Sequence, residues 1–432
     1  DRAMRYLILG SSLRGLHDVA RAVIGDGHDA VLYDAEHPGA PDDLVGCVEV
    51  VGPEWTDAFL DGIDRVVTTP WNAETRPPVG SALARGVEVI TEAGFGLERL
   101  DVPYVAITGT NGKTTVTEVT TDMLIASGVD AIAAGNIGAP VSSLSENDAD
   151  LLVLELSSYQ LRFMGHFEPM AVGLLNVAPD HLDWHGSMDA YVAAKARILD
   201  GSTAATIAAF NADDEVVRTI AEGSSATLVP CSGLRVPQKG NGVDSGALVL
   251  DGQRFDTPVT SETYRFNLVV AGTLALAAGA TPEGVADVVR SFTPGKHRRE
   301  LIATIGAVAY VNDSKATNPH AAVAAVGEFD SVILLAGGRN KDLDLSPLIG
   351  LPTTKELVAF GEAGPQIAAL AREAIHVEPG MSEAFSYAVS IAQPGDTVLL
   401  SPGCASFDEF SSYEARGDAF RSLVEDLEGV AA

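Results

Sequence analysis

Short apolar runs alternate with amphipathic stretches along most of this chain. In the first hundred residues the apolar runs are RYLILG, DAVLYD, DRVVTT and VEVI, each followed by polar or glycine-containing residues. Apolar runs of this length, separated by segments with helical spacing, predict parallel strands connected by helices. We therefore expect the chain to begin with a Rossmann-like α/β domain.

The same alternation of apolar runs and amphipathic stretches occurs in two further blocks of the chain. The second block opens at VPYVAITG and ends near TPGKHRRE, where a proline, a glycine and a basic cluster indicate a boundary. In the third block we expect strands at AVAYVND, SVILLAGG, ELVAFG and TVLLSPG. The pattern predicts an α/β protein with three domains in series, over residues 1–100, 101–297 and 298–432, with the third again Rossmann-like.

Composition is typical of a soluble globular protein, because 46% of the 432 residues are hydrophobic and 20% are charged. The longest uncharged apolar run, at 268–280, is shorter than the roughly 20 residues that a membrane span needs. Cys47, Cys231 and Cys404 are too few and too scattered for a disulfide framework. With no recognisable secretion signal at the N-terminus, we expect a cytoplasmic protein.

Charge narrows the choice of partners. The 28 basic and 59 acidic residues give a net charge of −31, which would repel a phosphate backbone. We therefore expect small-molecule substrates, no nucleic-acid or membrane partner, and a monomer. Only seven basic residues are lysines, at positions 113, 195, 239, 296, 315, 341 and 355. A salt-adapted surface or a biased genome would account for their scarcity, but not for where they lie.

The segment TGTNGKTT at 108–115 joins a predicted buried strand to a predicted helix. The usual phosphate-binding loop would have glycine at position 107, but here that residue is Ile107 and the first glycine is Gly109. Backbone amides at such a turn, with a helix N-terminus behind them, bind phosphate anions. Lys113 would neutralise phosphates and the Thr114 hydroxyl would reach Mg²⁺, so the central domain is predicted to bind ATP; the alternative is a purely structural turn. The predicted nucleotide-binding residues of the turn are Gly109, Thr110, Asn111, Gly112, Lys113, Thr114 and Thr115.

Two acidic features follow this turn along the chain. Glu155 ends the apolar run DLLVLE, and a buried carboxylate is costly unless it faces a metal or a base. The alternative is a glutamate that simply reaches solvent at a strand end. The loop NVAPDHLDWHG carries two aspartates and two histidines, a set that could bind zinc. Because no cysteine is present, we favour a second Mg²⁺ with His181 close to it.

The first domain carries a partial dinucleotide fingerprint. Gly10-x-Ser12-x-x-Gly15 follows a predicted strand, and Asp34 ends the next one, but the middle glycine of the fingerprint is missing. A strand-turn-helix without a ligand and an NAD-binding turn both remain open.

Several motifs occur in one order along residues 105–421: GTNGKTT, GNIGAP, ELSSYQL, NVAPDHLDWHG with YVAAKARIL, HRRE, NDSKATNP, AGGRNKDLDL and SPGCASFDEF. Together they resemble the ATP-dependent Mur ligases, and ELSSYQL and SPGCASFDEF favour the glutamate-adding branch. The resemblance implies a cytoplasmic step of peptidoglycan synthesis. In that step D-glutamate is joined to UDP-N-acetylmuramoyl-L-alanine through an acyl phosphate, with ATP and Mg²⁺ as cofactors.

The resemblance also implies a role for each matching residue. Lys113, His181 and Lys195 are the expected catalytic residues, and Lys195 corresponds to a lysine that is carbamylated in the family. The expected metal ligands are Thr114, Glu155, His181 and carbamylated Lys195. Further nucleotide contacts are expected from Asn267, Arg298 and Asp313. The expected substrate-binding residues are Asn136, Ser157, Lys315, Thr317, Lys341, Ser406 and Tyr413, with Ser12, Arg14 and Asp34 at the UDP end.

This sequence departs from the family pattern at several positions. Thr263 and Tyr264 replace a His-Asn pair, TTPWNAETRPP replaces a Ser-Pro-Gly-Ile segment, and the turn of the first domain carries Ser12 and Arg14. The identity of the first substrate therefore stays open. The alternatives are a related Mur-type ligase with another acceptor or with L-glutamate, a folylpolyglutamate synthase-like ligase, or a nucleotide-binding scaffold without turnover.

Overall fold

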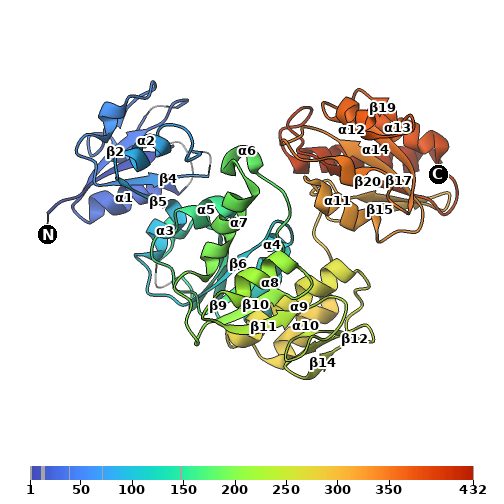
Figure 1. The fold of residues 1–432 in the computed structure, drawn as a ribbon, viewed down its shortest axis with the longest axis horizontal. Helices are drawn as coiled ribbons and strands as arrows, with labels where there is room; N and C mark the ends of the chain where they lie inside the picture. The colour runs from blue at the N-terminus through green and yellow to red at the C-terminus, as the bar shows by residue number, and fades with distance from the viewer. Residues whose placement is uncertain (1, 11–14, 38, 71, 146–147, 432) are drawn as a thin grey trace. The chain divides into compact units, whose positions relative to one another are not determined.

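The computed structural model describes residues 2–10, 15–37, 39–70, 72–145 and 148–431. The chain divides into two compact units, a larger one of Asp1–Val177 with Trp184–Phe292 and a smaller one of Ala178–Asp183 with Thr293–Ala432. Both units consist of sheets covered by helices (Figure 1). The predicted α/β class with parallel sheets is therefore confirmed, whereas the domain limits at residues 100 and 297 stay predictions.

The larger unit begins with a parallel five-stranded sheet of order β3-β2-β1-β4-β5. The four predicted runs form β1, β2, β4 and β5, while β3 was not predicted. Alternate residues of β1 face opposite sides: Tyr6 and Ile8 lie in one hydrophobic cluster, Leu7 and Leu9 in another. The elements are β1 (Arg5–Leu9), α1 (Leu16–Gly25), β2 (Asp29–Tyr33), η1 (Asp42–Leu44), β3 (Glu49–Val51), η2 (Asp57–Leu60), β4 (Arg65–Thr68), α2 (Val79–Ala84), β5 (Glu88–Thr91) and α3 (Glu92–Leu97).

A second parallel sheet in this unit has six strands in the order β11-β10-β9-β6-β8-β7. In its register Ile107 of β6 pairs with Glu155 of β8, so both strands end at the same edge. Its elements are β6 (Tyr104–Thr108), α4 (Lys113–Ala126), β7 (Ala131–Gly135), η3 (Val141–Ser143), β8 (Leu151–Glu155), α5 (Ser158–Arg162), β9 (Ala171–Leu174), α6 (Leu182–His185), α7 (Met188–Ala196), η4 (Arg197–Leu199), β10 (Ile207–Asn211), α8 (Glu215–Glu222) and β11 (Thr227–Cys231).

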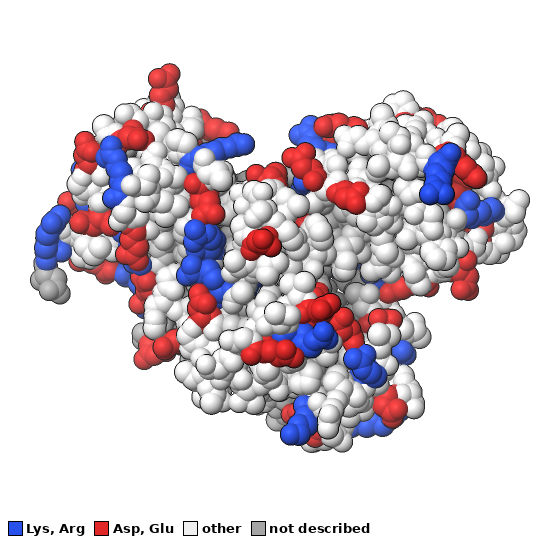
Figure 2. Space-filling model, viewed as in Figure 1, with Lys and Arg blue, Asp and Glu red and all other residues white. Residues whose placement is uncertain are grey.

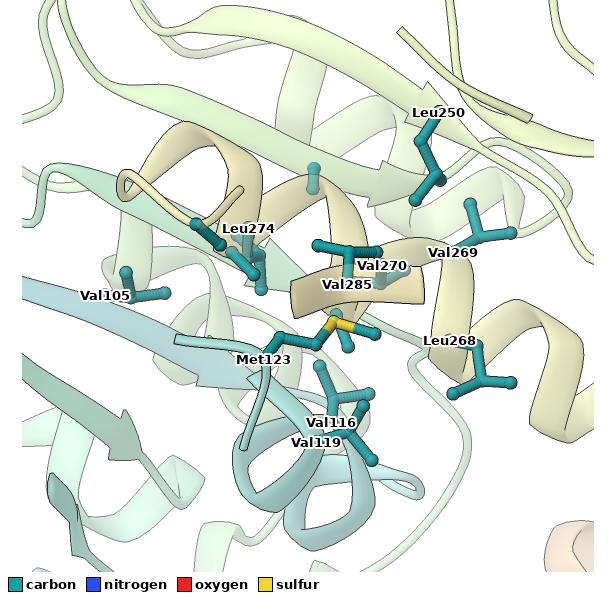
Figure 3. Packing of buried hydrophobic residues seen from close by; sticks show 14 of the residues in the cluster. Val105, Val116, Val119, Met123, Leu250, Leu268, Val269, Val270, Leu274 and Val285 are labelled. Carbon is teal, nitrogen blue, oxygen red and sulfur yellow. The ribbon is translucent and has the colours of Figure 1, made fainter. Parts of the chain in front are cut away.

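The rest of the larger unit is a small antiparallel sheet and two helices. The sheet consists of β12 (Gly242–Asp244), β13 (Ala247–Leu250) and β14 (Gln253–Phe255), and the helices are α9 (Glu262–Ala277) and α10 (Pro282–Ser291). The apolar run at 268–280 lies mostly in α9, which packs against α4, β9 and β10. Figure 3 shows Val270 and Leu274 of α9 close to Met123 and Val105. Among the described residues, none of the helices has the length and apolar character needed to span a bilayer.

The smaller unit contains a six-stranded sheet of order β15-β16-β20-β17-β18-β19, parallel except for β15. All four predicted strands of this block are present, as β16, β17, β18 and β20, whereas β15 and β19 were not predicted. Its elements are β15 (Glu300–Ile305), β16 (Val308–Asn312), α11 (Pro319–Val326), β17 (Val332–Gly337), η5 (Ser346–Leu348), β18 (Thr354–Phe360), α12 (Gly364–Leu370), β19 (His376–Glu378), α13 (Met381–Ile391), β20 (Thr397–Gly403) and α14 (Tyr413–Ala431). The loops after β16, β17 and β20 leave the sheet at its carboxyl edge, where α/β proteins bind ligands.

Candidate active site

The phosphate turn lies between β6 and α4 in the larger unit. Gly112 is the N-cap of α4 and has a φ of 88°, a conformation that favours glycine. A Cβ added at Gly112 would lie 2.9 Å from Asn267 Oδ1, so the turn packs tightly against α9. Asn267 is buried, and the structure thus places it beside the turn to which it was assigned.

Asn176, which follows β9, fixes the shape of the turn. Its side-chain oxygen accepts a hydrogen bond from Asn111 N–H at 2.8 Å, and its Nδ2 donates to Asn111 O at 3.0 Å. Its own carbonyl accepts from Thr110 N–H at 2.9 Å. Asn176 was not predicted as a site residue, although it is the first residue of NVAPDHLDWHG and follows a buried strand.

Lys113 and Lys195 meet at one backbone oxygen of the turn. Lys113 Nζ donates to Gly109 O at 2.9 Å and to Thr110 O at 3.0 Å, and Lys195 Nζ donates to Gly109 O at 2.8 Å. Lys195, from α7, is only 1% exposed, and its ammonium lies 4.7 Å from the centre of the Tyr191 ring. Lys113 places a positive charge at the turn, as an ATP phosphate site requires, and Lys195 is a buried amine beside it.

Glu155 ends β8 beside this turn and is 2% exposed. Its Oε1 accepts from Asn136 Nδ2 at 2.7 Å, and its backbone carbonyl accepts from Asn136 N–H at 2.9 Å. Its Oε2 is buried and has no hydrogen-bond partner among the described residues. A buried carboxylate oxygen without a partner is costly, and a cation would satisfy it.

The residues present fit Mg²⁺ better than zinc. Among the described residues no group of three or more His, Cys, Asp or Glu side chains could hold a metal ion. Mg²⁺ needs only one or two carboxylates, because water and substrate phosphates supply its other ligands. His185, one of the histidines considered for zinc, is stacked on Tyr159, and burial lowers its pKa to about 4, with the Lys195 and Arg162 charges adding to this effect.

Ser157 and Asp34 both make local backbone contacts. Ser157 caps α5, its hydroxyl accepting from Gln160 N–H at 3.3 Å. Asp34, which follows β2, is 7% exposed and accepts from the backbone N–H groups of Glu36 and His37, both at 2.9 Å. Ser12 and Arg14, the other residues expected at the UDP end, lie outside the described residues.

In the smaller unit, Asp313 follows β16 and is 6% exposed. Its carboxylate accepts from Ser401 Oγ at 2.7 Å and from Arg299 N–H at 3.1 Å. Burial raises the pKa of Asp313 to about 6, although the Arg299 guanidinium opposes this. Arg298, the other predicted nucleotide contact of this unit, lies half-buried in the same segment as Arg299.

Lys341 lies in the loop after β17 and pairs with Asp180, 161 positions earlier in the chain. Lys341 Nζ is 2.6 Å from Asp180 Oδ1, and Asn318 Nδ2 donates to Asp180 Oδ2 at 3.1 Å. Burial alone would raise the pKa of Asp180, but the charges of Lys341 and His181 and these hydrogen bonds hold it below its usual value. His181 has a φ of 53° and places Nε2 3.7 Å from Asp180 Oδ2. Whether His181 joins Glu155 at a metal stays a prediction.

The other residues expected to bind glutamate lie on loops at the carboxyl edge of the same sheet. Lys315 Nζ lies 3.9 Å from the centre of the Tyr413 ring, a close cation–π contact. Thr317 is half-buried between β16 and α11, and Ser406 is 2% exposed after β20. The smaller unit thus places Lys315, Lys341, Thr317 and Ser406 on loops at one edge of one sheet, where a small charged ligand could bind, with Tyr413 at the first residue of α14.

The fold and the site define an α/β nucleotide-phosphate-binding enzyme with an acidic residue suited to a divalent cation. The chain matches the Mur ligase middle domain over residues 107–272 and the Mur ligase glutamate ligase domain over residues 297–404. Proteins named UDP-N-acetylmuramoylalanine--D-glutamate ligase are similar along the whole chain. The one from Frankia casuarinae is 38% identical over 98% of this chain and 94% of its own length, and the one from Thermobifida fusca is 36% identical over 99% of each. The chain belongs to the Mur ligase family.

Solved structures agree with this membership at the level of fold. A pseudomurein peptide ligase type C from Methanothermus fervidus has a TM-score of 0.60 and 15% identity, with 98% of this chain and 100% of that chain covered. The MurF ligase from Thermotoga maritima, solved in complex with ADP, has a TM-score of 0.59 and 16% identity, with 98% of each chain covered.

Proposed function

We propose that this protein is an ATP-dependent, ADP-forming ligase that joins D-glutamate to UDP-N-acetylmuramoyl-L-alanine, a cytoplasmic step of peptidoglycan synthesis. The names of its full-length relatives support the reaction. The observation that supports the chemistry best is the buried Glu155 oxygen that has no partner among the described residues, at the same sheet edge as a turn whose carbonyl groups accept hydrogen bonds from Lys113 and Lys195. The net charge of −31 agrees with small-molecule substrates rather than a nucleic acid.

The reaction needs an activated carboxylate. A substrate carboxylate oxygen attacks the γ-phosphorus of ATP and ADP leaves, giving an acyl phosphate. The glutamate amine then attacks the acyl carbon, phosphate leaves, and the amine loses a proton as the amide forms. Lys113 offsets the negative charge of the two anions that must approach each other, and the amides of the turn orient the phosphates. Bound Mg²⁺, for which Glu155 and Thr114 are the proposed ligands, would neutralise further phosphate charge.

We propose that Lys195 reacts with CO₂ to form a carbamate. Its complete burial beside the phosphate turn supports this, because a buried ammonium is costly and would repel a cation. A carbamate would instead provide an oxygen ligand. In the smaller unit, Arg298 and Asp313 are proposed to contact the nucleotide, and Lys315 and Lys341 to bind the carboxylates of glutamate. In a protein of charge −31, a dianionic substrate needs such local positive charge.

Phosphate release measured with ATP, Mg²⁺, UDP-N-acetylmuramoyl-L-alanine and either D- or L-glutamate tests the proposal. We expect turnover with D-glutamate and its loss in Lys113→Ala. Lys239→Ala is the matched control, because Lys239 is an exposed loop lysine. Turnover with L-glutamate only, or with a folate or another carboxylate acceptor only, would identify one of the alternative ligases. Absence of turnover with every acceptor would leave only the nucleotide-binding scaffold.

A further inference from the structure

A short segment of the larger unit, Gly135–Ser142, is hydrogen-bonded to β8 of the second parallel sheet and to residues at the starts of α1 and α3, which follow strands of the first. It begins at the last residue of β7 and ends in η3. At its start Asn136 is bonded to Glu155 twice, once through its backbone N–H and once through its side chain. Within the segment, Gly135 N–H donates to Ala139 O at 3.2 Å. The segment is thus a closed turn whose first residues are fixed to the proposed metal ligand.

The other end of the segment is bonded to elements of the first sheet. Ser142 Oγ donates to the carbonyl of Gly15, immediately before α1, at 2.9 Å. Ser142 N–H donates to Glu92 Oε1, at the start of α3, at 2.6 Å. Burial raises the pKa of Glu92, in agreement with a contact shielded from water. One serine therefore joins two elements of the first sheet to the segment that holds Glu155.

Packing at this junction leaves no room for side chains. Gly15 has a φ of 90°, and a Cβ added to it would lie 2.8 Å from Pro140 Cβ. A Cβ added to Gly96 of α3 would lie 2.7 Å from Ser142 N. Both distances are shorter than real Cβ contacts, so Gly15 packs directly against the Pro140 ring and Gly96 against the backbone of Ser142. Gly15 is needed here for packing, whatever ligand the first sheet binds.

On the basis of the proposed function, we propose that Ser142 and Glu92 are positioning residues for the first substrate. They set where the start of α1 lies relative to the Glu155 carboxylate. The nucleotide end of that substrate is expected on the first sheet, while its carboxylate must reach the phosphate turn. A small displacement of the first sheet would move the substrate carboxylate away from the position in which it can attack the phosphate. A displacement of about 1 Å can reduce a reaction rate by about a hundredfold.

Steady-state kinetics test this role with the variants Ser142→Ala and Glu92→Ala. We expect kcat with UDP-N-acetylmuramoyl-L-alanine to fall by about tenfold or more, while the KM for ATP and the calorimetric affinity for UDP alone stay within about twofold. Glu92→Gln keeps a carbonyl that can accept from Ser142 N–H, and should restore most of the rate. Ser143→Ala is the matched control, because the exposed Ser143 hydroxyl donates only to Pro140 O, at 2.7 Å, inside the same segment.

Three kinetic outcomes would overturn the proposal. One is an unchanged kcat in both alanine variants, and another is an equal loss in Ser143→Ala. The third is a loss of UDP affinity in parallel with kcat, which would mean that Ser142 and Glu92 shape the nucleotide pocket itself. Thermal melting confirms that each variant is folded before its rate is interpreted.

A distance measurement tests the same idea without the reaction. Cys47 is exposed near the first sheet, whereas Cys231 and Cys404 are buried. A spin label on Cys47 and another introduced by Glu222→Cys in α8 would report the distance between the two sheets by pulsed electron resonance. We expect a broader distribution in Ser142→Ala than in Ser143→Ala or the parent protein, and equal distributions would refute the positioning role. If the distances change as expected but the parent protein does not turn over, only the proposed function fails.

Discussion

Replacing Asp313 by asparagine is expected to stabilise the smaller unit and to abolish activity. Asp313 is almost fully buried, and burial raises the pKa of its carboxyl to about 6 from an ordinary value of 3.8. The Arg299 guanidinium and the Ser401 hydroxyl favour the ionised form, whereas the Glu328 charge disfavours it. The ionised carboxylate is therefore less stable in the folded protein than in the unfolded chain.

The magnitude follows from the difference between the two pKa values. A change from 3.8 to about 6 is about two units, or about 3 kcal/mol at ~1.36 kcal/mol per unit. Because the pKa of Asp313 is higher in the folded protein than in the unfolded chain, the contribution of Asp313 to the free energy of unfolding is fully present below pH ~4. This contribution is lost as the pH rises through ~6. Asparagine is neutral throughout, but it weakens one of the two hydrogen bonds, which costs ~1 kcal/mol. The expected net gain at pH 8 is ~2 kcal/mol, and it disappears near pH 4.

Thiol labelling during urea unfolding can measure this gain for each unit separately. Cys404 is buried in the smaller unit and Cys231 in the larger one, so each reports the unfolding of its own unit. At pH 8 Cys404 should become reactive at higher urea in Asp313→Asn than in the wild type, while the transition at Cys231 should not change. Phosphate release in the same samples measures the accompanying loss of activity.

Asp396→Asn is the matched control with the opposite sign. Asp396 is also buried in the smaller unit, but the hydrogen bonds from Lys355 and Ser331 outweigh burial and lower its pKa. Its ionised form stabilises the fold above its unfolded pKa, so the asparagine variant should be less stable at pH 8. The reasoning is refuted if Asp313→Asn is no more stable than the wild type at pH 8, or if its advantage persists unchanged at pH 4.

Three further outcomes are expected. Lys195→Ala should lose most activity without unfolding. Short carboxylic acids, which can replace the carbamate oxygens, should restore part of this activity. Full turnover of Lys195→Ala without added acid would exclude the carbamate. Lys341→Ala should raise the KM for glutamate about ten- to a hundredfold, because a charge-assisted contact contributes ~1.5–3 kcal/mol. The KM for ATP should stay nearly unchanged. An unchanged KM for glutamate would contradict the assignment of Lys341 to glutamate binding. The melting temperature should rise more with KCl than with sucrose of equal osmolality, because salt screens the repulsion between acidic side chains in a chain of charge −31. Equal effects of KCl and sucrose would show that this repulsion is small.

The sequence could predict most strands and the phosphate turn because these depend on local patterns. Each predicted apolar run is long enough to form one buried strand, and Gly112 and Lys113 mark the start of α4. The small antiparallel sheet β12–β14 was not predicted, because its strands are very short and follow a segment without clear periodicity. The net charge of −31 follows from composition alone, whereas Figure 2 shows acidic and basic side chains scattered among other residues on the face in view.

Contacts between distant parts of the chain could not be predicted in the same way. Nothing near Asp180 in the sequence indicates that it pairs with Lys341, and nothing near Ser142 indicates that it bonds to Gly15. Such contacts depend on which strands are neighbours and on the register between them, and a local pattern contains neither. Glu155 is an intermediate case, because its place at the end of an apolar run predicted that it is buried. Only the structure shows that one carboxylate oxygen accepts a hydrogen bond from Asn136 and that the other has no partner among the described residues.

The seven lysines differ in how far they are buried. Lys113, Lys195, Lys315 and Lys341, which the family resemblance assigned to the site, are all at least partly buried, whereas Lys239, Lys296 and Lys355 are exposed. Burying an ammonium is unfavourable unless nearby groups compensate its charge. Here the compensation is the Gly109 carbonyl for Lys113 and Lys195, the Tyr413 ring for Lys315 and the Asp180 carboxylate for Lys341. Because charges are screened over about 8 Å at physiological ionic strength, each of these groups sets the potential around it largely independently of distant acidic residues. With Lys195 as the proposed carbamate, the positive charge for the ATP phosphates comes from Lys113 in the larger unit, and that for glutamate from Lys315 and Lys341 in the smaller unit.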